Sequence, residues 1–199
     1  MGFFAPAVLD LLLQHLAVTF AALSIVRERR GGTMELFRVS PLSAAEALIG
    51  KYISYLVFGG VIAAVLTFLI VYGLHIPMLG NWGDFALVIG GVLFTSLTIG
   101  FIISILSQTD SQAVQYSMIV LLTAVFFSGF IMNLNMITPQ VRIVSWTMPT
   151  TYGAILLRDI MLRGASPAPL YLGGLFAIGL GLLVIAWLLM RRSISTVQD

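Results

Sequence analysis

The sequence predicts an all-α integral membrane protein, with about five transmembrane helices, a short cytoplasmic helix and an outer re-entrant helical hairpin. Three observations support this fold class. Hydrophobic residues make up 59% of the 199 residues and charged residues only 9%, whereas soluble domains contain roughly 25% charged residues. The mean hydropathy is +1.05. Several apolar runs reach roughly 20 residues, which is the length that a helix needs to cross a bilayer.

Five apolar segments are long enough to span a membrane. We expect these spans at about 5–26, 49–72, 85–106, 113–132 and 170–190, within one transmembrane domain over residues 1–199. Residues that favour helix starts precede four of them, beginning with Ser43 and Glu46 as a capping box ahead of the second. Asp84 lies before the third span and Asp110 before the fourth, while Ser166 and Pro167 offer an N-cap and a first-turn proline for the fifth.

The basic residues predict the orientation of the spans. Seven of the ten Lys and Arg residues lie between Ser24 and Lys51 or near the C-terminus, and three lie in the long connection before the fifth span. Because cytoplasmic loops carry an excess of basic residues, we expect loop 27–48 and the C-terminus in the cytoplasm of a cell with the chain in its inner (plasma) membrane. The N-terminus then lies outside, and we expect that an earlier helix is missing from the chain.

The connection at residues 133–168 predicts two short helices. Pro139, after Thr138, and Pro149 each occupy a favourable first-turn position. Apolar residues recur at helical spacing after both prolines, with Arg158 among the charged residues on the second helix. Both helices are too short to span, which favours a re-entrant or interfacial hairpin on the outer side.

Polar residues in the first span allow two interpretations. Asp10 and Gln14 are one helical turn apart, and His15 follows them. A proton relay would require further acidic partners at depth, and the later spans contain none. We favour an interfacial position or a helix contact, because Asp10 lies near the outer end of its span, where water is within reach.

The sequence lacks the motifs of an enzyme. It contains no cysteine, no H-E-x-x-H zinc motif and no G-x-S-x-G nucleophile motif, so we assign no catalytic residue and no metal ligand. Gly50 and Lys51 lack the glycine spacing and the Ser or Thr of a phosphate-binding loop. Ser128 and Gly129 are small residues that favour close helix packing.

The loop at residues 27–48 holds an unusual share of the charge. A cluster that bound only anionic lipid would avoid acids, yet Glu28, Glu35 and Glu46 are interleaved with the arginines. Thr33 can cap a short helix that ends near Val39, with apolar residues beside both signs of charge. Such a helix is suited to docking in the groove of a protein partner.

The segment Val26–Lys51, VRERRGGTMELFRVSPLSAAEALIGK, resembles the signature of the ABC-2 type permeases, the membrane subunits of ATP-binding cassette exporters. The matching residues are Arg27, Glu28, Arg29, Gly32, Thr33, Glu35, Pro41, Gly50 and Lys51. The later segment FFSGFIMNLNMITPQVRIVSWTMPTTYGAILLRDIMLRG is similar to the outer hairpin of that family, and FFAPAVL is similar to the opening of its second span.

The resemblance implies a permease that lacks the usual first transmembrane helix. It would move a drug-like or lipid-like amphiphile across the bilayer, together with a second permease subunit (the same chain or another) and with an ABC ATP-binding subunit that holds the ATP and Mg²⁺. Nucleic acid is not implied as a partner. The implied coupling residues are Arg27, Glu28, Arg29, Gly32, Thr33, Glu35, Leu36 and Pro41. The implied residues of an outer hairpin gate are Ser128, Gly129, Pro139, Pro149 and Arg158, and no substrate-binding residue is assigned.

Two alternatives remain at the level of the sequence. The chain could be a membrane anchor that recruits a cytosolic ATPase or another partner without transport by this chain alone. An intramembrane enzyme is disfavoured by the missing motifs.

Overall fold

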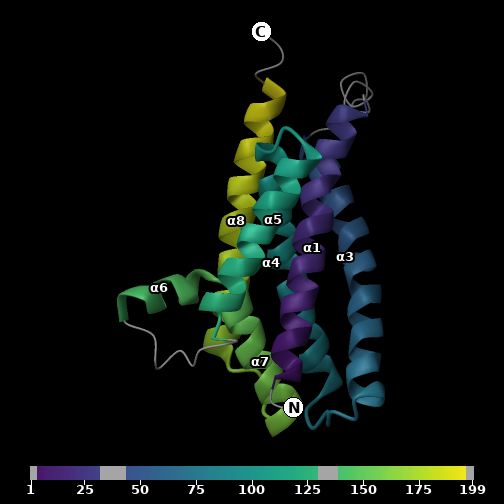
Figure 1. The fold of residues 1–199 in the computed structure, drawn as a ribbon, viewed down its shortest axis with the longest axis vertical. Coiled ribbons are helices and arrows are strands. Elements are labelled where there is room, and N and C mark those ends of the chain that lie inside the picture. The colour runs from purple at the N-terminus through teal and green to yellow at the C-terminus, as the bar shows by residue number, and fades with distance from the viewer. Residues whose placement is uncertain (1–3, 32–43, 130–138, 196–199) are drawn as a thin grey trace.

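The computed structural model describes residues 4–31, 44–129 and 139–195, and every regular element in these ranges is a helix (Figure 1). The elements are α1 (Ala5–Arg30), α3 (Ala44–Phe68), the π-helical turn η1 (Leu69–Gly73), α4 (Trp82–Leu106), α5 (Asp110–Phe127), α6 (Pro139–Thr147), α7 (Pro149–Arg163) and α8 (Pro169–Ser195). Among the described residues, five helices are long and apolar enough to cross a membrane: α1, α3 with η1, α4, α5 and α8. The protein is therefore an all-α, multi-pass membrane protein, as the sequence predicts.

Helix α4 is the centre of the bundle. It packs against α1, α3, α5, α7 and α8, and it is the most enclosed of the five long helices (Figure 1). Helices α1 and α4 run in the same direction, with Gly100 of α4 beside Val18 and Ala21 of α1. Leu13 of α1, Leu97 of α4 and Leu157 of α7 are each at most 1% exposed and belong to one hydrophobic cluster. The apolar core thus includes α7 as well as the long helices.

Two helices begin earlier than the sequence predicts, because other residues cap them. The side chain of Asn81 accepts a hydrogen bond from the Gly83 amide at 2.8 Å, so Asp84 lies inside the first turn of α4. At α5, the Thr109 hydroxyl accepts from the Gln112 amide at 3.2 Å, and Asp110 is the first helical residue. Both acids still lie near the positive end of a helix dipole.

Two other limits differ from the expected ones. Helix α5 ends at Phe127 and not at Met132, since Gly129 has a positive φ of 81°, which breaks the helical path. Helix α8 begins at Pro169, and the Ala168 carbonyl accepts hydrogen bonds from the Tyr171 and Leu172 amides, both at 3.1 Å. The first-turn proline is therefore Pro169 and not Pro167.

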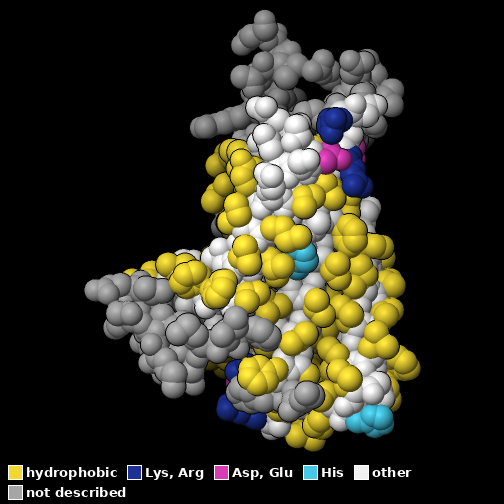
Figure 2. All heavy atoms as spheres, viewed as in Figure 1, with side chains coloured by type: hydrophobic (Ala, Val, Ile, Leu, Met, Phe, Trp, Pro, Cys, Tyr) yellow, Lys and Arg dark blue, Asp and Glu magenta, His cyan; other side chains and the backbone are white. Residues whose placement is uncertain are grey.

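The bundle has two distinct ends. We call one the charged end, defined by Arg27, Glu28, Lys51 and Asp110, and the other the hairpin end, defined by α7 and loop 74–81. At the hairpin end, the Leu79 amide donates to the Met161 carbonyl of α7 at 3.1 Å. On the face that Figure 2 shows, hydrophobic side chains cover most of the surface between the charged groups near the two ends.

The two short helices of residues 133–168 differ in their environment. Helix α7 packs against α1, α4 and α8, and most of its residues are buried. Helix α6 projects sideways from the bundle, with Ile143 largely exposed (Figure 1). Of the two helices in the hairpin, α7 is therefore the one that packs inside the bundle.

Candidate functional site

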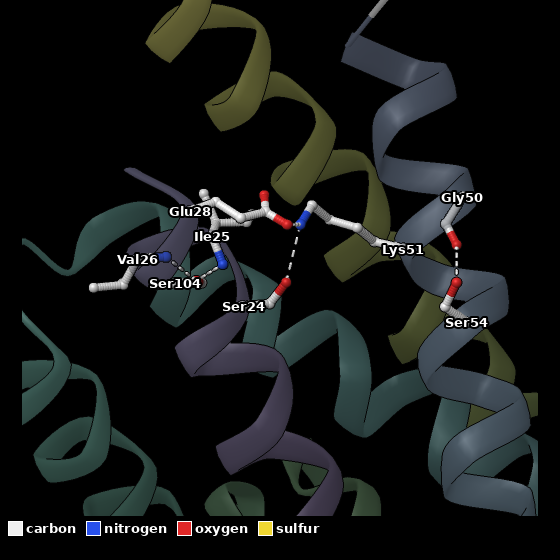
Figure 3. A network of polar contacts seen from close by, with 8 residues as sticks. All are labelled: Ser24, Ile25, Val26, Glu28, Gly50, Lys51, Ser54 and Ser104. Carbon is white, nitrogen blue, oxygen red and sulfur yellow. Dashed lines mark hydrogen bonds and ion pairs between the residues drawn. The ribbon is translucent and has the colours of Figure 1, made fainter. Parts of the chain in front are cut away.

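The charged end is held together by an ion pair between α1 and α3. The Lys51 ammonium of α3 reaches across to the Glu28 carboxylate of α1 and also donates a hydrogen bond to the Ser24 hydroxyl at 3.1 Å (Figure 3). Only 12% of the Lys51 side chain and 31% of the Glu28 side chain are exposed. Because both charges have lost much of their water, each depends on the other for compensation. Lys51 thus lies against α1 instead of extending to the surface.

A second group of charges joins α1 to α5. Asp110, the first residue of α5, lies 3.4 Å from Arg27 Nε and 3.6 Å from Arg30 Nη1. These distances are long for charge-assisted hydrogen bonds, so the contacts are ion pairs without close hydrogen bonding. The arginine side chains are mostly exposed, which makes their contribution to stability small. These ion pairs hold the start of α5 next to the end of α1.

A buried serine joins α1 to α4. The Ser104 hydroxyl accepts hydrogen bonds from the Ile25 and Val26 amides of α1, at 2.9 Å and 3.2 Å (Figure 3). One turn earlier, a Cβ placed on Gly100 would lie 2.5 Å from Ala21 Cβ and 2.6 Å from the Val18 carbonyl oxygen. The two helix backbones are therefore in close contact along this part of α1.

The final turns of α1 are consequently attached to three helices. Lys51 attaches them to α3, Ser104 to α4 and Asp110 to α5. The same turns lead directly into residues 32–43, and α3 begins immediately after them. A force applied to residues 32–43 would therefore reach α3, α4 and α5 together. The arrangement is suited to transmitting a movement.

The predicted coupling residues fall partly within this site. Arg27 and Glu28 lie in it, and Arg29 belongs to the last turn of α1. The remaining predicted coupling residues and the short helix expected at residues 33–39 lie outside the described residues: Gly32, Thr33, Glu35, Leu36 and Pro41. The roles of Ser24, Lys51, Ser104 and Asp110 in this site were not predicted from the sequence. Asp110 could have been found from topology, since the end of the first span and the start of the fourth lie on the same side.

The predicted gate residues lie at both ends of the hairpin. Ser128 is buried and Gly129 ends α5, while Pro139 and Pro149 begin α6 and α7. Arg158 is partly buried on α7, about two turns after Pro149. These five residues thus lie at the end of α5, at the starts of α6 and α7 and within α7, and their role as a gate stays a prediction.

The electrostatics of Arg158 follow from its position. Burial lowers the pKa of the Arg158 guanidinium, and the positive charge of Arg163 lowers it further. Asp159 acts in the opposite direction, and it forms an ion pair with Arg163 at 2.8 Å. Since arginine has a very high reference pKa, Arg158 remains a cation at neutral pH.

An aromatic cluster joins α6, α7 and α8. The rings of Trp146 and Tyr171 are stacked, with 5.8 Å between centroids and 4° between planes. The Tyr152 hydroxyl donates to the Trp146 carbonyl at 2.8 Å, and Gly174 of α8 leaves room for the Tyr152 ring. This cluster keeps α6 and α7 at a fixed angle, and the sequence analysis did not identify it.

The expectation that water reaches Asp10 is wrong. Its side chain is fully buried where α1 meets α4 and α7, and Gln14, one turn later, is only 2% exposed. The alternative interpretation, a polar residue at a helix contact, agrees with this position. The reason is that α7 folds back over the start of α1, which the position of Asp10 in its apolar run does not reveal.

Comparisons with known proteins identify the family of this chain. The family model described as "ABC-2 type transporter" matches residues 3–162. The chain is 30% identical over 185 residues to "Inner membrane transport permease YhhJ" of Escherichia coli (strain K12), covering 91% of this chain and 49% of that protein. It is 26% identical over 197 residues to "Probable multidrug ABC transporter permease YbhS" of the same organism, covering 97% of this chain and 52% of that protein.

Another relative has a lower identity and is much longer than this chain. "ABC transporter G family member 20" of Dictyostelium discoideum is 24% identical over 164 residues, covering 82% of this chain and 22% of that protein. The chain thus spans about half the length of the Escherichia coli relatives it matches and less of this one. Because the family model covers most of the sequence, the chain belongs to the ABC-2 type transporter family.

Proposed function

We propose that this chain is a membrane-spanning permease subunit of an ABC exporter, which moves a drug-like or lipid-like amphiphile. ATP and Mg²⁺ are held and used by a separate ABC ATP-binding subunit. The observation that carries the proposal is the charged end, where the last turns of α1 are attached to α3, α4 and α5 on either side of residues 32–43. Membership of the ABC-2 type family supports it further.

In this proposal the charged end faces the cytoplasm of a cell with the protein in its inner membrane. The basic residues Arg27, Arg30 and Lys51 lie at this end, and Arg191 lies near the end of α8. The positive-inside rule supports this orientation. The hairpin end, with α6 and α7, then faces outward and closes the exit side through Ser128, Gly129, Pro139, Pro149 and Arg158.

The proposed coupling step is mechanical. An ATP-binding subunit docks on loop 27–48, where Gly32, Thr33, Glu35, Leu36 and Pro41 set the contact by shape and charge. When that subunit closes on ATP, the loop moves, and the attachments at Glu28, Ser104 and Asp110 pass the displacement to three helices at once. A rigid-body shift of packed helices is a common form of such transitions.

A second permease subunit, identical or different, completes the pathway in this proposal. The outward faces of α3 and α5 carry many exposed apolar side chains, among them Phe58, Val61, Ile119 and Leu122. Such faces contact lipid or another helix when the protein is in a bilayer.

Capture of the ATP-binding subunit is the direct test. The full chain in detergent should retain the ABC ATP-binding subunit from the same source, and Glu35→Arg should abolish that retention because it reverses a charge in the docking loop. The control is Asp84→Arg, which reverses a charge in the first turn of α4, far from the loop. Folded wild-type chain that captures no ATP-binding subunit would contradict the proposal.

The alternative, a membrane anchor without transport, makes a different prediction. It shares with the permease the docking of a cytosolic ATPase on loop 27–48 and differs only in the absence of transport by this chain alone. Vesicles that contain the captured complex should accumulate a fluorescent amphiphile on addition of ATP if the chain is a permease. Capture that is sensitive to Glu35→Arg without any ATP-dependent accumulation would instead support the anchor.

A further inference from the structure

Asp10 occupies an unusual position for a carboxyl group. It lies on α1 at the contact with α4 and α7, and its exposed fraction is 0%. Neither carboxyl oxygen has a hydrogen-bond partner among the described residues. None of the four ion pairs found among those residues includes Asp10.

Helix α7 seals this carboxyl group. A Cβ placed on Gly153 would lie 2.2 Å from Asp10 Oδ1, 2.7 Å from Asp10 Cγ and 2.8 Å from Val92 Cγ2. The backbone of α7 therefore rests directly on the carboxyl group, with no space for water between them. Only a residue without a side chain allows this approach. The burial of Asp10 therefore depends on α7 lying in this position.

Other buried polar groups surround the contact. Gln14 lies one turn after Asp10 on α1, Ser96 one turn after Val92 on α4, and Thr150 one turn before Gly153 on α7. Each of the three is at most 2% exposed, and each has side-chain atoms without a hydrogen-bond partner among the described residues. The contact between α1, α4 and α7 is thus a buried polar strip that a shift of α7 would open.

The charged and titratable groups of the neighbouring helices do not compensate Asp10. On α1 itself these groups are His15 and, at the far end of the helix, Arg27, Glu28, Arg29 and Arg30. Helix α4 carries Asp84, and α7 carries Tyr152, Arg158, Asp159 and Arg163. The remaining groups are Asp110 and Tyr116 on α5, Glu46, Lys51, Tyr52 and Tyr55 on α3, and Tyr72 in η1. Asp10 forms no hydrogen bond with any side chain that the structure describes, and none of the ion pairs found among the described residues includes it. Gly153, whose backbone lies against the carboxyl group, and Val92, which is close to the same point on α7, carry no titratable side chain.

A buried carboxylate without a partner is far less stable than a buried carboxylic acid, because the charged form loses its hydration without compensation. We propose that Asp10 is a proton-binding site, which is filled when α7 lies on α1 and is emptied when α7 moves away. The carboxylate takes up one proton from water at the hairpin end as the contact closes, and it releases that proton to water as the contact opens. Closure of the hairpin is thereby coupled to a proton.

This inference goes beyond the proposed transport and does not depend on an ATP-binding subunit. A single acid is sufficient for this proton binding, although the other spans supply no acid for a proton relay. The carboxyl group exchanges its proton with water when α7 opens, and no chain of further acids is required.

Infrared spectroscopy of the full chain in liposomes tests whether the site holds a proton. A protonated carboxyl group has its own carbonyl stretch, and the chain has only eight Asp and Glu side chains, so the band can be assigned. We expect the band in the wild type at neutral pH, its loss in Asp10→Asn and its retention in Asp84→Asn. A wild-type spectrum identical to that of Asp10→Asn would overturn the proposal.

Thiol labelling tests the link to α7. The chain has no cysteine, so Ala154→Cys places a single thiol on the buried face of α7, where Ala154 is 6% exposed. Ser166→Cys, at an exposed position beyond α7, corrects for the rise in thiol reactivity with pH. From mildly acidic to alkaline pH, corrected labelling of Ala154→Cys should rise several-fold, because loss of the proton favours the open contact.

The same experiment with Asp10→Asn decides the cause. The amide keeps the size of the carboxyl group and remains neutral, so corrected labelling of Ala154→Cys with Asp10→Asn should stay low at every pH. Asp84→Asn should leave the several-fold rise unchanged. An equal rise in the presence of Asp10→Asn would show that α7 opens for another reason and would overturn the proposal.

Discussion

The ion pairs at the charged end differ in how much they contribute to the stability of the protein. Lys51 and Glu28 are mostly shielded from water, whereas Arg27 and Arg30 are mostly exposed around Asp110. Exposed pairs contribute about 0–1 kcal/mol and breaking a buried pair costs about 3–5 kcal/mol. The Lys51 pair lies between these limits, so it is the ion pair whose loss should be measurable.

Lys51→Met should lower the free energy of unfolding by about 1–2 kcal/mol, since it leaves the partly buried Glu28 carboxylate without its partner. The measurement is a reversible detergent or SDS unfolding titration. Adding Glu28→Gln to Lys51→Met should recover part of the loss, because no unpaired charge remains. Unfolding of Lys51→Met at the wild-type midpoint would mean that the pair contributes nothing.

Glycines on α4 offer a matched comparison. Gly100→Ala should destabilise the protein by about 1–3 kcal/mol, because its Cβ would meet the α1 backbone at 2.6 Å. Gly90→Ala, on the same helix with no neighbour within 4 Å of the new Cβ, should be neutral or stabilising by up to about 1 kcal/mol. Thermal unfolding in detergent measures both, and equal midpoints would contradict the close contact of α1 with α4.

At the scale of the elements, α7 behaves as part of the core although it is too short to span. It packs on α1, α4 and α8, while α6 remains outside this packing. The aromatic cluster of Trp146, Tyr152 and Tyr171 is the connection that fixes one relative to the other. The strength of that connection decides whether the hairpin moves as one body.

Tyr152→Phe should cost about 1 kcal/mol, because it removes the hydrogen bond from the Tyr152 hydroxyl to the Trp146 carbonyl and keeps the ring. The fluorescence of Trp146, in a background with the other two tryptophans replaced, reports the local transition. Tyr116→Phe, at an exposed position on α5, is the control and should leave the transition unchanged. Identical transitions for all three proteins would exclude this hydrogen bond as a fastening of the hairpin.

Element boundaries show how far the sequence is informative. The long helices were predictable because length and apolar content are local properties, and both prolines at the starts of α6 and α7 were read correctly. The end of α5 at Phe127 could not be predicted from the sequence, because Gly129 adopts a positive φ and so interrupts a run of apolar residues that is continuous in the sequence. Local signals locate helices better than they locate the ends of helices.

The candidate site was less predictable than the fold, for a physical reason. The contacts of Ser104 with α1 and of Asp110 with Arg27 join residues about 80 positions apart, and no local pattern encodes such distances. Asp10 is a second case, because its burial is produced by α7 from the far part of the chain. The charged residues were found by composition, and their partners only by the structure.

For the whole molecule, the proposed orientation can be tested with single cysteines in the cysteine-free chain. Ser166→Cys lies at the hairpin end and Ser111→Cys at the charged end, and both positions are exposed. A membrane-impermeant maleimide added to intact cells should label Ser166→Cys only, while permeabilised cells should label both. Labelling of Ser111→Cys alone in intact cells would contradict the proposed orientation.

The close contact of α1 with α4 has a consequence for the stiffness of the molecule. Two rods that can slide past one another bend as easily as two separate rods, but bonded rods resist bending as one thicker beam. The Gly100 contact and the two hydrogen bonds to Ser104 prevent sliding between α1 and α4. A load on residues 32–43 would therefore tilt this pair of helices as a single beam, and the deformation would fall on the more loosely packed helices around it.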